Sequence, residues 1–140
     1  MVMRHLFIVS LVLLSACASS RPIEVHTTAD SAVLANAESV EIRLANFSFK
    51  PSDIHLKAGR AYRLVLFNET SGGHSFAAPD FFESAQIAPA DADKVSDGTI
   101  DIAGNATETV VLIPTTGTYD LVCGHFGHAA LGMTGELVVD

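Results

Sequence analysis

Short runs of alternating apolar and polar residues, separated by glycine, proline and asparagine, most constrain how this 140-residue chain can fold. In the first run, Val40, Ile42 and Leu44 alternate with Glu41 and Arg43, which is the pattern of a strand with one buried face. Seven segments have this character, or eight if residues 74–76 are counted: residues 39–49, 54–56, 62–67, 99–102, 107–113, 118–123 and 135–139. Many short strands joined by turn residues predict an all-β fold, either an antiparallel sandwich or a barrel.

Residues 80–98 interrupt this pattern. They contain too few β-branched residues to form regular strands. We therefore expect a loop with one or two short helical turns that lies across the sandwich. Three aspartates, Asp91, Asp93 and Asp97, are close together in this loop, but they lack the glycine and the terminal glutamate of a calcium-binding loop. We expect them to be solvated.

Composition and charge exclude several classes of function. Apolar residues make up 49% of the chain, which is enough to build a core. Eight Lys and Arg residues stand against sixteen Asp and Glu residues, giving a net charge of −8 without any basic run, so nucleic-acid binding is excluded. The sequence has no nucleophile elbow, phosphate-binding glycine loop or His-Glu-x-x-His motif. We expect neither an enzyme nor a small-molecule substrate.

The N-terminus has the pattern of an export signal. A short basic start precedes the apolar run 6–14, which is too short to span a bilayer. The run ends in Leu14-Ser15-Ala16-Cys17, which resembles the lipobox of bacterial lipoproteins. That resemblance implies cleavage after residue 16 and acylation of Cys17, which would anchor the chain to a membrane. An ordinary signal peptide is the alternative.

We therefore predict three parts: a signal peptide over residues 1–16, a lipidated N-terminus and tether over residues 17–37, and one domain over residues 38–140. The predicted location is the periplasm or cell envelope, and Ala18 after Cys17 is compatible with the outer membrane. After acylation of Cys17, Cys123 would be the one remaining thiol. A free thiol is unusual in an exported protein, so we expect the sulfur of Cys123 to have a ligand.

Residues 123–133 carry three candidate metal ligands in one short loop. Cys123, His128 and Met133 follow the spacing Cys-x4-His-x4-Met, and His74 follows a glycine-rich turn 49 residues before Cys123. Loops at one end of a sandwich lie close together, so His74 can approach this loop. A thiolate, two imidazoles and a thioether suit one copper ion. Zinc is the main competitor, but Met is a poor zinc ligand.

These residues resemble the motifs of the cupredoxins, the family of blue (type 1) copper proteins. Residues 119–123 (Tyr-Asp-Leu-Val-Cys) resemble the family's penultimate strand, and residues 128–139 resemble its ligand loop and last strand. The resemblance covers about residues 39–139 and implies a Greek-key β-sandwich with one mononuclear type 1 copper site. It implies that His74, Cys123, His128 and Met133 are the ligands, with Cys123 as the charge-transfer thiolate and Met133 as the weak axial ligand.

His125 departs from the family pattern, in which an apolar residue or a proline is common between the Cys and the His. It is a rival ligand, a solvent-facing relay or a group that docks a partner. The four-residue step to Met133 favours His128 as the ligand. An additional His near a metal site often contacts the ligands and does not bind the metal itself. His26 and His55 are predicted to be solvated.

Two further predictions concern residues around the site. Asn68 either hydrogen-bonds the ligand loop or simply terminates a strand. Six phenylalanines are predicted to form the core and an apolar shell around the metal: Phe47, Phe49, Phe67, Phe76, Phe81 and Phe82.

The resemblance implies a membrane-tethered electron-transfer protein that cycles one copper ion between Cu(I) and Cu(II) and meets a redox partner protein. A copper carrier, chaperone or buffer that delivers copper to an acceptor protein is the alternative, because the same soft ligands capture Cu(I). A third hypothesis is an adhesion-like β-sandwich in which the metal ligands are vestigial.

Overall fold

The computed structural model describes residues 22–28 and 31–140 of the chain. The predicted signal peptide over residues 1–16 and the predicted lipidation site Cys17 lie outside the described residues. Among the described residues, no helix is both long and apolar enough to cross a membrane.

The described residues form short strands and a few helical turns, as the alternating pattern predicted. The strands are β1 (His26–Thr27), β2 (Glu38–Ala45), β3 (Ser48–Lys50), β4 (Asp53–Leu56), β5 (Tyr62–Asn68), β6 (His74–Ala77), β7 (Gln86–Ile87), β8 (Thr99–Ile102), β9 (Thr107–Ile113), β10 (Gly117–Val122) and β11 (Thr134–Val139). The helical elements are α1 (Ser31–Ala35), α2 (Pro79–Ser84) and the 3₁₀ helix η1 (Pro89–Lys94).

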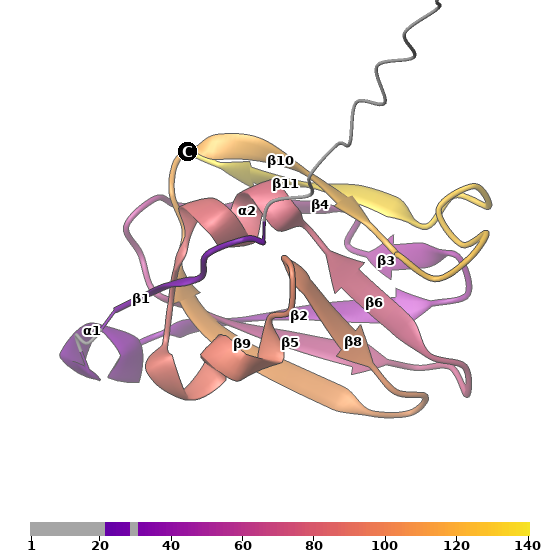
Figure 1. Ribbon diagram of the computed structural model, residues 1–140, viewed down its shortest axis with the longest axis horizontal. Coiled ribbons are helices and arrows are strands. Elements are labelled where there is room, and N and C mark those ends of the chain that lie inside the picture. The colour runs from indigo at the N-terminus through magenta and orange to yellow at the C-terminus, as the bar shows by residue number, and fades with distance from the viewer. Residues whose placement is uncertain (1–21, 29–30) are drawn as a thin grey trace, which may run out of the picture.

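The strands build two sheets that enclose one core (Figure 1). One sheet has the order β1-β7-β9-β5-β2-β3, and the other has the order β4-β11-β10-β6-β8. The residues buried between them come from both sheets, including Leu44 and Leu64 from the first and Phe76 and Leu121 from the second. The predicted all-β sandwich is therefore confirmed.

The sheets are mixed, although the sequence pattern suggested antiparallel ones. β2 runs parallel to β5, and β4 runs parallel to β11. A parallel pair needs a crossover between its strands, and the turns after β2 and β4 do carry the chain into other strands before the partner is reached. Alternation along one strand does not reveal the direction of its neighbour, which is why the sequence could not supply this feature.

Residues 80–98 contain the helical turns that were expected, α2 and η1, but also the short strand β7. β7 pairs with β9, and β1 adds to the same edge in parallel. The apolar side chain of Val25, just before β1, packs against the core. Residues 25–27, within the segment predicted as a tether, therefore contact the domain.

Most of the six phenylalanines lie in the core, with two exceptions. Phe76, Phe81 and Phe82 are fully buried, whereas Phe67 is half-buried. Phe47 is 40% exposed, because it lies in the turn between β2 and β3 with a left-handed backbone (φ 59°). Phe47 is therefore not part of the core, but its ring meets the ring of the predicted ligand His128 edge to face at 5.3 Å, which agrees with the predicted apolar shell.

The topology brings two important loops to the same end of the molecule. The turn between β5 and β6 and the loop between β10 and β11 both lie at the right-hand end of Figure 1, opposite α1. β6 is antiparallel to β10 within its sheet, with Ala77 opposite Val122, so the start of β6 lies beside the residues that follow β10. The predicted ligand residues occur at these two places.

Asn68, at the end of β5, organises the turn that leads into β6. Its side chain is fully buried, and its amide nitrogen donates to the carbonyl oxygens of Gly72, Ile102 and Ala103 at 2.8–3.1 Å. Its side-chain oxygen accepts hydrogen bonds from the backbone N–H and the hydroxyl of Thr70. Asn68 therefore fixes its own turn against β8, and these bonds do not reach the loop after β10.

We predict that Asn68→Ala lowers the free energy of unfolding by about 2–3 kcal/mol, because the buried side chain would lose its bonds to three carbonyl oxygens, of which that of Ile102 is buried. Urea denaturation followed by circular dichroism measures this change. Asn46→Ala, in the exposed turn after β2, is the matched control and should change the free energy by less than about 0.5 kcal/mol. Equal effects of the two substitutions would contradict the role given to Asn68.

Candidate metal centre

The ends of three neighbouring strands position the predicted ligands. His74 is the first residue of β6, Cys123 directly follows β10, and Met133 directly precedes β11. β10 and β11 are antiparallel neighbours, and the backbone N–H of Cys123 donates to the carbonyl oxygen of Met133 at 3.1 Å. The side chains that are distant in sequence therefore meet at one end of one sheet.

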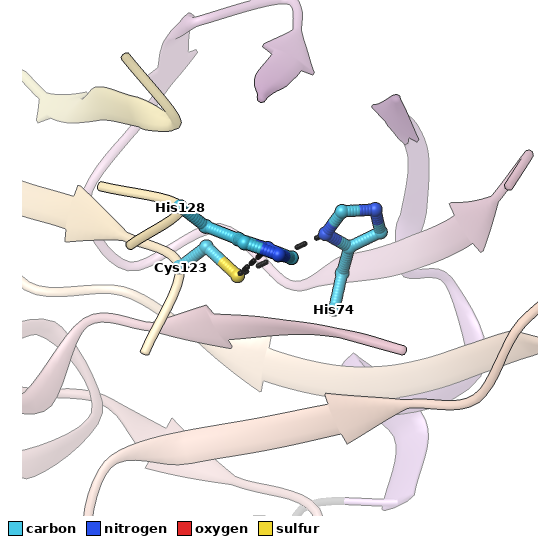
Figure 2. Close-up of side chains that lie close together, drawn as sticks. All are labelled: His74, Cys123 and His128. Atoms are coloured by element: carbon cyan, nitrogen blue, oxygen red, sulfur yellow. Dashed lines mark hydrogen bonds between the residues drawn. The ribbon is translucent and has the colours of Figure 1, made fainter. Parts of the chain in front are cut away.

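Three of the predicted ligands point toward one another (Figure 2). The Sγ atom of Cys123 lies 3.9 Å from Nδ1 of His74 and 3.5 Å from Nδ1 of His128. The ligand atoms of these three residues all lie within 4.8 Å of one another, and they form the one such group of three among the described His, Cys, Asp and Glu residues.

This arrangement fits a single transition-metal ion. A metal–sulfur bond and a metal–nitrogen bond together span about 4.3 Å, which exceeds both measured sulfur–nitrogen separations. An ion between them could therefore contact the sulfur and either nitrogen at ordinary bond lengths. A thiolate with two imidazoles is a donor set that copper accepts.

Met133 completes the predicted set at the end of the loop. It is fully buried, and its backbone N–H donates to the carbonyl oxygen of His128 at 3.0 Å. Gly127 and Gly132 adopt left-handed conformations (φ 80° and 103°), which glycine tolerates without steric cost and which allow the loop to close tightly. The loop thereby holds His128 and Met133 on the same compact turn as Cys123.

Ser75 contacts the sulfur and was not singled out by the sequence. Its backbone N–H donates to Sγ of Cys123 at 3.4 Å, and its hydroxyl lies 3.9 Å from the same atom. The Ser75 hydroxyl also accepts a hydrogen bond from the backbone N–H of Gly124 at 2.8 Å. Its position next to the predicted ligand His74 could have identified Ser75 from the sequence, because a residue beside His74 is close to the loop that carries Cys123.

The three grouped side chains differ in exposure. His74 is 3% exposed and Cys123 is 2% exposed, whereas His128 is half-buried. Burial, and then the nearby imidazoles of His128 and His125, lower the pKa of His74 below its usual 6.5. His74 is therefore held in the neutral form, which is the form that binds metal.

His125 is outside the group of three. Its side chain is 41% exposed, and its Nε2 atom lies 3.8 Å from a carboxylate oxygen of Asp101. Its ring stacks on the ring of His128, with centroids 5.6 Å apart and an angle of 24°. His55 lies on the exposed face of β4, and His26 is exposed in β1, as predicted.

An apolar surface patch surrounds His128. Three of the four exposed large apolar side chains among the described residues lie here: Phe47, Phe126 and Leu131, which are 40%, 103% and 63% exposed. Phe126 and Leu131 belong to the same loop as His128, and the ring of Phe47 meets the ring of His128 edge to face at 5.3 Å. We call these three residues the apolar patch.

Comparisons with known proteins agree with this geometry. The sequence profile of the copper binding proteins of the plastocyanin/azurin family matches residues 36–140. No curated protein matches the chain by sequence.

Among solved structures, an auracyanin from Roseiflexus castenholzii is 18% identical, with a TM-score of 0.57 over 74% of this chain and 98% of that one. Auracyanin A, a "blue" copper protein from Chloroflexus aurantiacus, is 21% identical, with a TM-score of 0.53 over 73% and 98%. The multicopper oxidase McoA from Aquifex aeolicus is 15% identical, with a TM-score of 0.59 over 75% of this chain but only 30% of that one. At these identities the likeness establishes the fold.

The prediction of a cupredoxin with copper as its cofactor is thus confirmed by the family profile, together with the grouped His, Cys and His side chains. By its profile match over residues 36–140, the chain belongs to the plastocyanin/azurin family of copper binding proteins.

Proposed function

We propose that this chain is an electron carrier in which His74, Cys123, His128 and Met133 bind one copper ion. Bound copper would supply reversible one-electron exchange between Cu(I) and Cu(II). The observation that carries the proposal is the contrast between the two buried donors, His74 and Cys123, and the half-buried His128, whose ring lies within the apolar patch.

The hydrogen bonds around Cys123 support fast electron exchange. Ser75 donates to the sulfur, and Gly124 donates to Ser75, so the sulfur is held by two segments at once. A fixed set of donors changes little when the charge of the site changes, and hydrogen bonds to a sulfur ligand tune the metal that it binds. These hydrogen bonds support the proposal of a site that changes little on electron exchange.

The same donors argue against catalysis at the metal. Four protein ligands would leave no open coordination position for a substrate, whereas catalytic metals keep one. The buried setting of Cys123 and Met133 would also exclude a substrate from their side of the site. We therefore propose that the protein is not an enzyme.

His128 is the proposed route for the electron to a partner protein. Of the three grouped side chains it is the one that reaches the surface. The apolar patch around it gives a desolvated contact area, which favours close approach of a partner. A protein that delivers copper must release the ion to its acceptor, whereas an electron carrier keeps it. Measuring whether copper stays bound during electron exchange therefore distinguishes the two functions.

An exported location and a lipid anchor on Cys17 are also proposed. They are supported by the apolar run 6–14 and the lipobox-like Leu14-Ser15-Ala16-Cys17. Anchoring would keep the carrier at a membrane surface, where its redox partner or copper acceptor would meet it.

We predict that the copper-loaded protein has an intense visible absorption band from charge transfer between the Cys123 thiolate and Cu(II), and that Cys123→Ser abolishes it. His55→Gln, on the exposed face of β4, is the control and should keep the band. A colourless copper-loaded protein would contradict the proposed copper site, and so would a visible band that persists in Cys123→Ser.

We predict that the metal-free protein loses stability as the pH falls below about 6.5. The pKa of His74 is lowered in the folded chain, so below its ordinary value the unfolded chain binds a proton at this position that the folded chain does not bind. Glutamine does not bind this proton, so His74→Gln lacks this loss of stability. The free energy of unfolding of the variant should therefore rise relative to that of the unaltered protein as the pH falls. Urea denaturation at pH 7.5 and pH 5 measures it. A difference that is independent of pH would refute the assignment.

We predict that Phe126→Lys slows electron self-exchange between Cu(I) and Cu(II) copies of the protein by about tenfold, because like charges would repel where two apolar patches meet. Line broadening in NMR spectra of mixed oxidation states measures the rate. Val33→Lys, at a 37% exposed position in α1, is the control and should leave the rate within about twofold of the original. Equal rates for Phe126→Lys and the unaltered protein would show that docking occurs elsewhere.

A further inference from the structure

A hollow of about 540 Å³ lies beside His74 on the surface, distinct from the apolar patch. Three of the side chains that line it can bind a metal ion: His125, Asp101 and Glu108. Asp101 is on β8, Glu108 is on β9, and His125 is in the loop after β10. The hollow therefore gathers an imidazole and two carboxylates from three separate elements.

The structure holds the ring of His125 in a defined position over Gly73. A Cβ atom built on Gly73 would lie only 3.1 Å from Cε1 of His125, so the absence of a side chain there gives the ring its space. The ring of His128 also stacks on the ring of His125. An imidazole that already contacts its neighbours loses less freedom on binding a ligand, which favours binding.

The distance between His125 and Asp101 is that of an ion pair, and it is also within the span of a shared metal ion. The Nε2 atom and the Asp101 oxygen are 3.8 Å apart, which is too long for a hydrogen bond. An ion bound about 2.1 Å from each atom would span up to about 4.2 Å, so it could contact both with a modest bend. Asp101 is 82% exposed at its side chain, so an ion from solution can reach it.

The chemistry of these ligands indicates the kind of ion. Imidazole with carboxylate suits Zn²⁺, Cu²⁺ and Ni²⁺, and the absence of a thiolate or thioether disfavours Cu(I). The half-buried Glu108 borders the same hollow and adds negative charge. The chain as a whole carries a net charge of −8, which raises the local concentration of cations.

We propose that His125 and Asp101 form a second metal site that binds a divalent transition-metal ion such as Zn²⁺ or Cu²⁺, with Glu108 bordering the same hollow but not within ligand distance of both. This site is separate from the group of His74, Cys123 and His128, because His125 is not a member of that group. It gives the departure of His125 from the family pattern a function of its own. The two metal sites would be neighbours, since His74 borders the same hollow.

The test is a calorimetric titration of the Cu(I)-loaded protein with Zn²⁺, with the copper content measured afterwards. We expect one equivalent of Zn²⁺ to bind while copper is retained, and we expect His125→Gln or Asp101→Asn to weaken the binding at least tenfold. His55→Gln and Asp120→Asn alter an exposed imidazole and an exposed carboxylate on other strands, so they are matched controls and should not weaken it.

Two results would overturn the second site: no binding of Zn²⁺ to the copper-loaded protein, or unchanged binding by His125→Gln. The same titration of Cys123→Ser distinguishes this failure from a failure of the proposed electron carrier. If the copper site is absent but the second site is real, Cys123→Ser should still bind one Zn²⁺ in a manner that depends on His125. Loss of Zn²⁺ binding in Cys123→Ser, with the fold intact by circular dichroism, would count against a separate site.

Discussion

The hydrogen bonds that Ser75 makes with Cys123 and Gly124 hold the functional end of this protein together. Ser75 and Cys123 are 48 residues apart in the sequence, and the backbone N–H of Ser75 reaches the sulfur while its hydroxyl accepts from Gly124. Without these contacts the start of β6 and the loop after β10 would be joined near the site mainly by the single register pair between Val122 and Ala77. Ser75 therefore acts together with the turn held by Asn68 and the pairing of β6 with β8 to set the separation between the imidazole of His74 and the sulfur.

The surface around His128 differs in character from the surface around His125, and each suits one of the two proposed functions. Around His128 the surface is apolar, through Phe47, Phe126 and Leu131. Around His125 it is acidic, through Asp101 and Glu108. An apolar surface favours contact with another protein, whereas an acidic hollow attracts cations. One loop of eleven residues, 123–133, supplies a histidine to each side.

Local features of the sequence predicted much of this molecule. The strands followed from alternation, because a half-buried strand imposes a period of two on its residues. The spacing Cys-x4-His-x4-Met identified the loop, because three residues with metal-binding chemistry stood at this regular spacing within eleven positions, with His125 as a fourth among them. His74 could be proposed from its place after a turn, since loops at one end of a sandwich lie near one another.

The remaining features depend on pairings that no local pattern encodes. The parallel pairing of β2 with β5 and of β4 with β11 is set by the crossovers between them. The partners of Asn68 include carbonyl oxygens 34 and 35 residues away, so its role in its own turn was visible only in three dimensions. Phe47 is exposed because its turn has a left-handed backbone, although its residue type favours burial. The approach of His125 to Asp101 likewise requires β8 to lie beside β6.

Anomalous diffraction at the copper edge from crystals of the protein loaded with one equivalent of copper tests the central claim most directly. We expect one strong peak within bonding distance of Sγ of Cys123 and of the Nδ1 atoms of His74 and His128. A peak bonded to His125 and Asp101 alone, with no density beside the Cys123 sulfur, would contradict it.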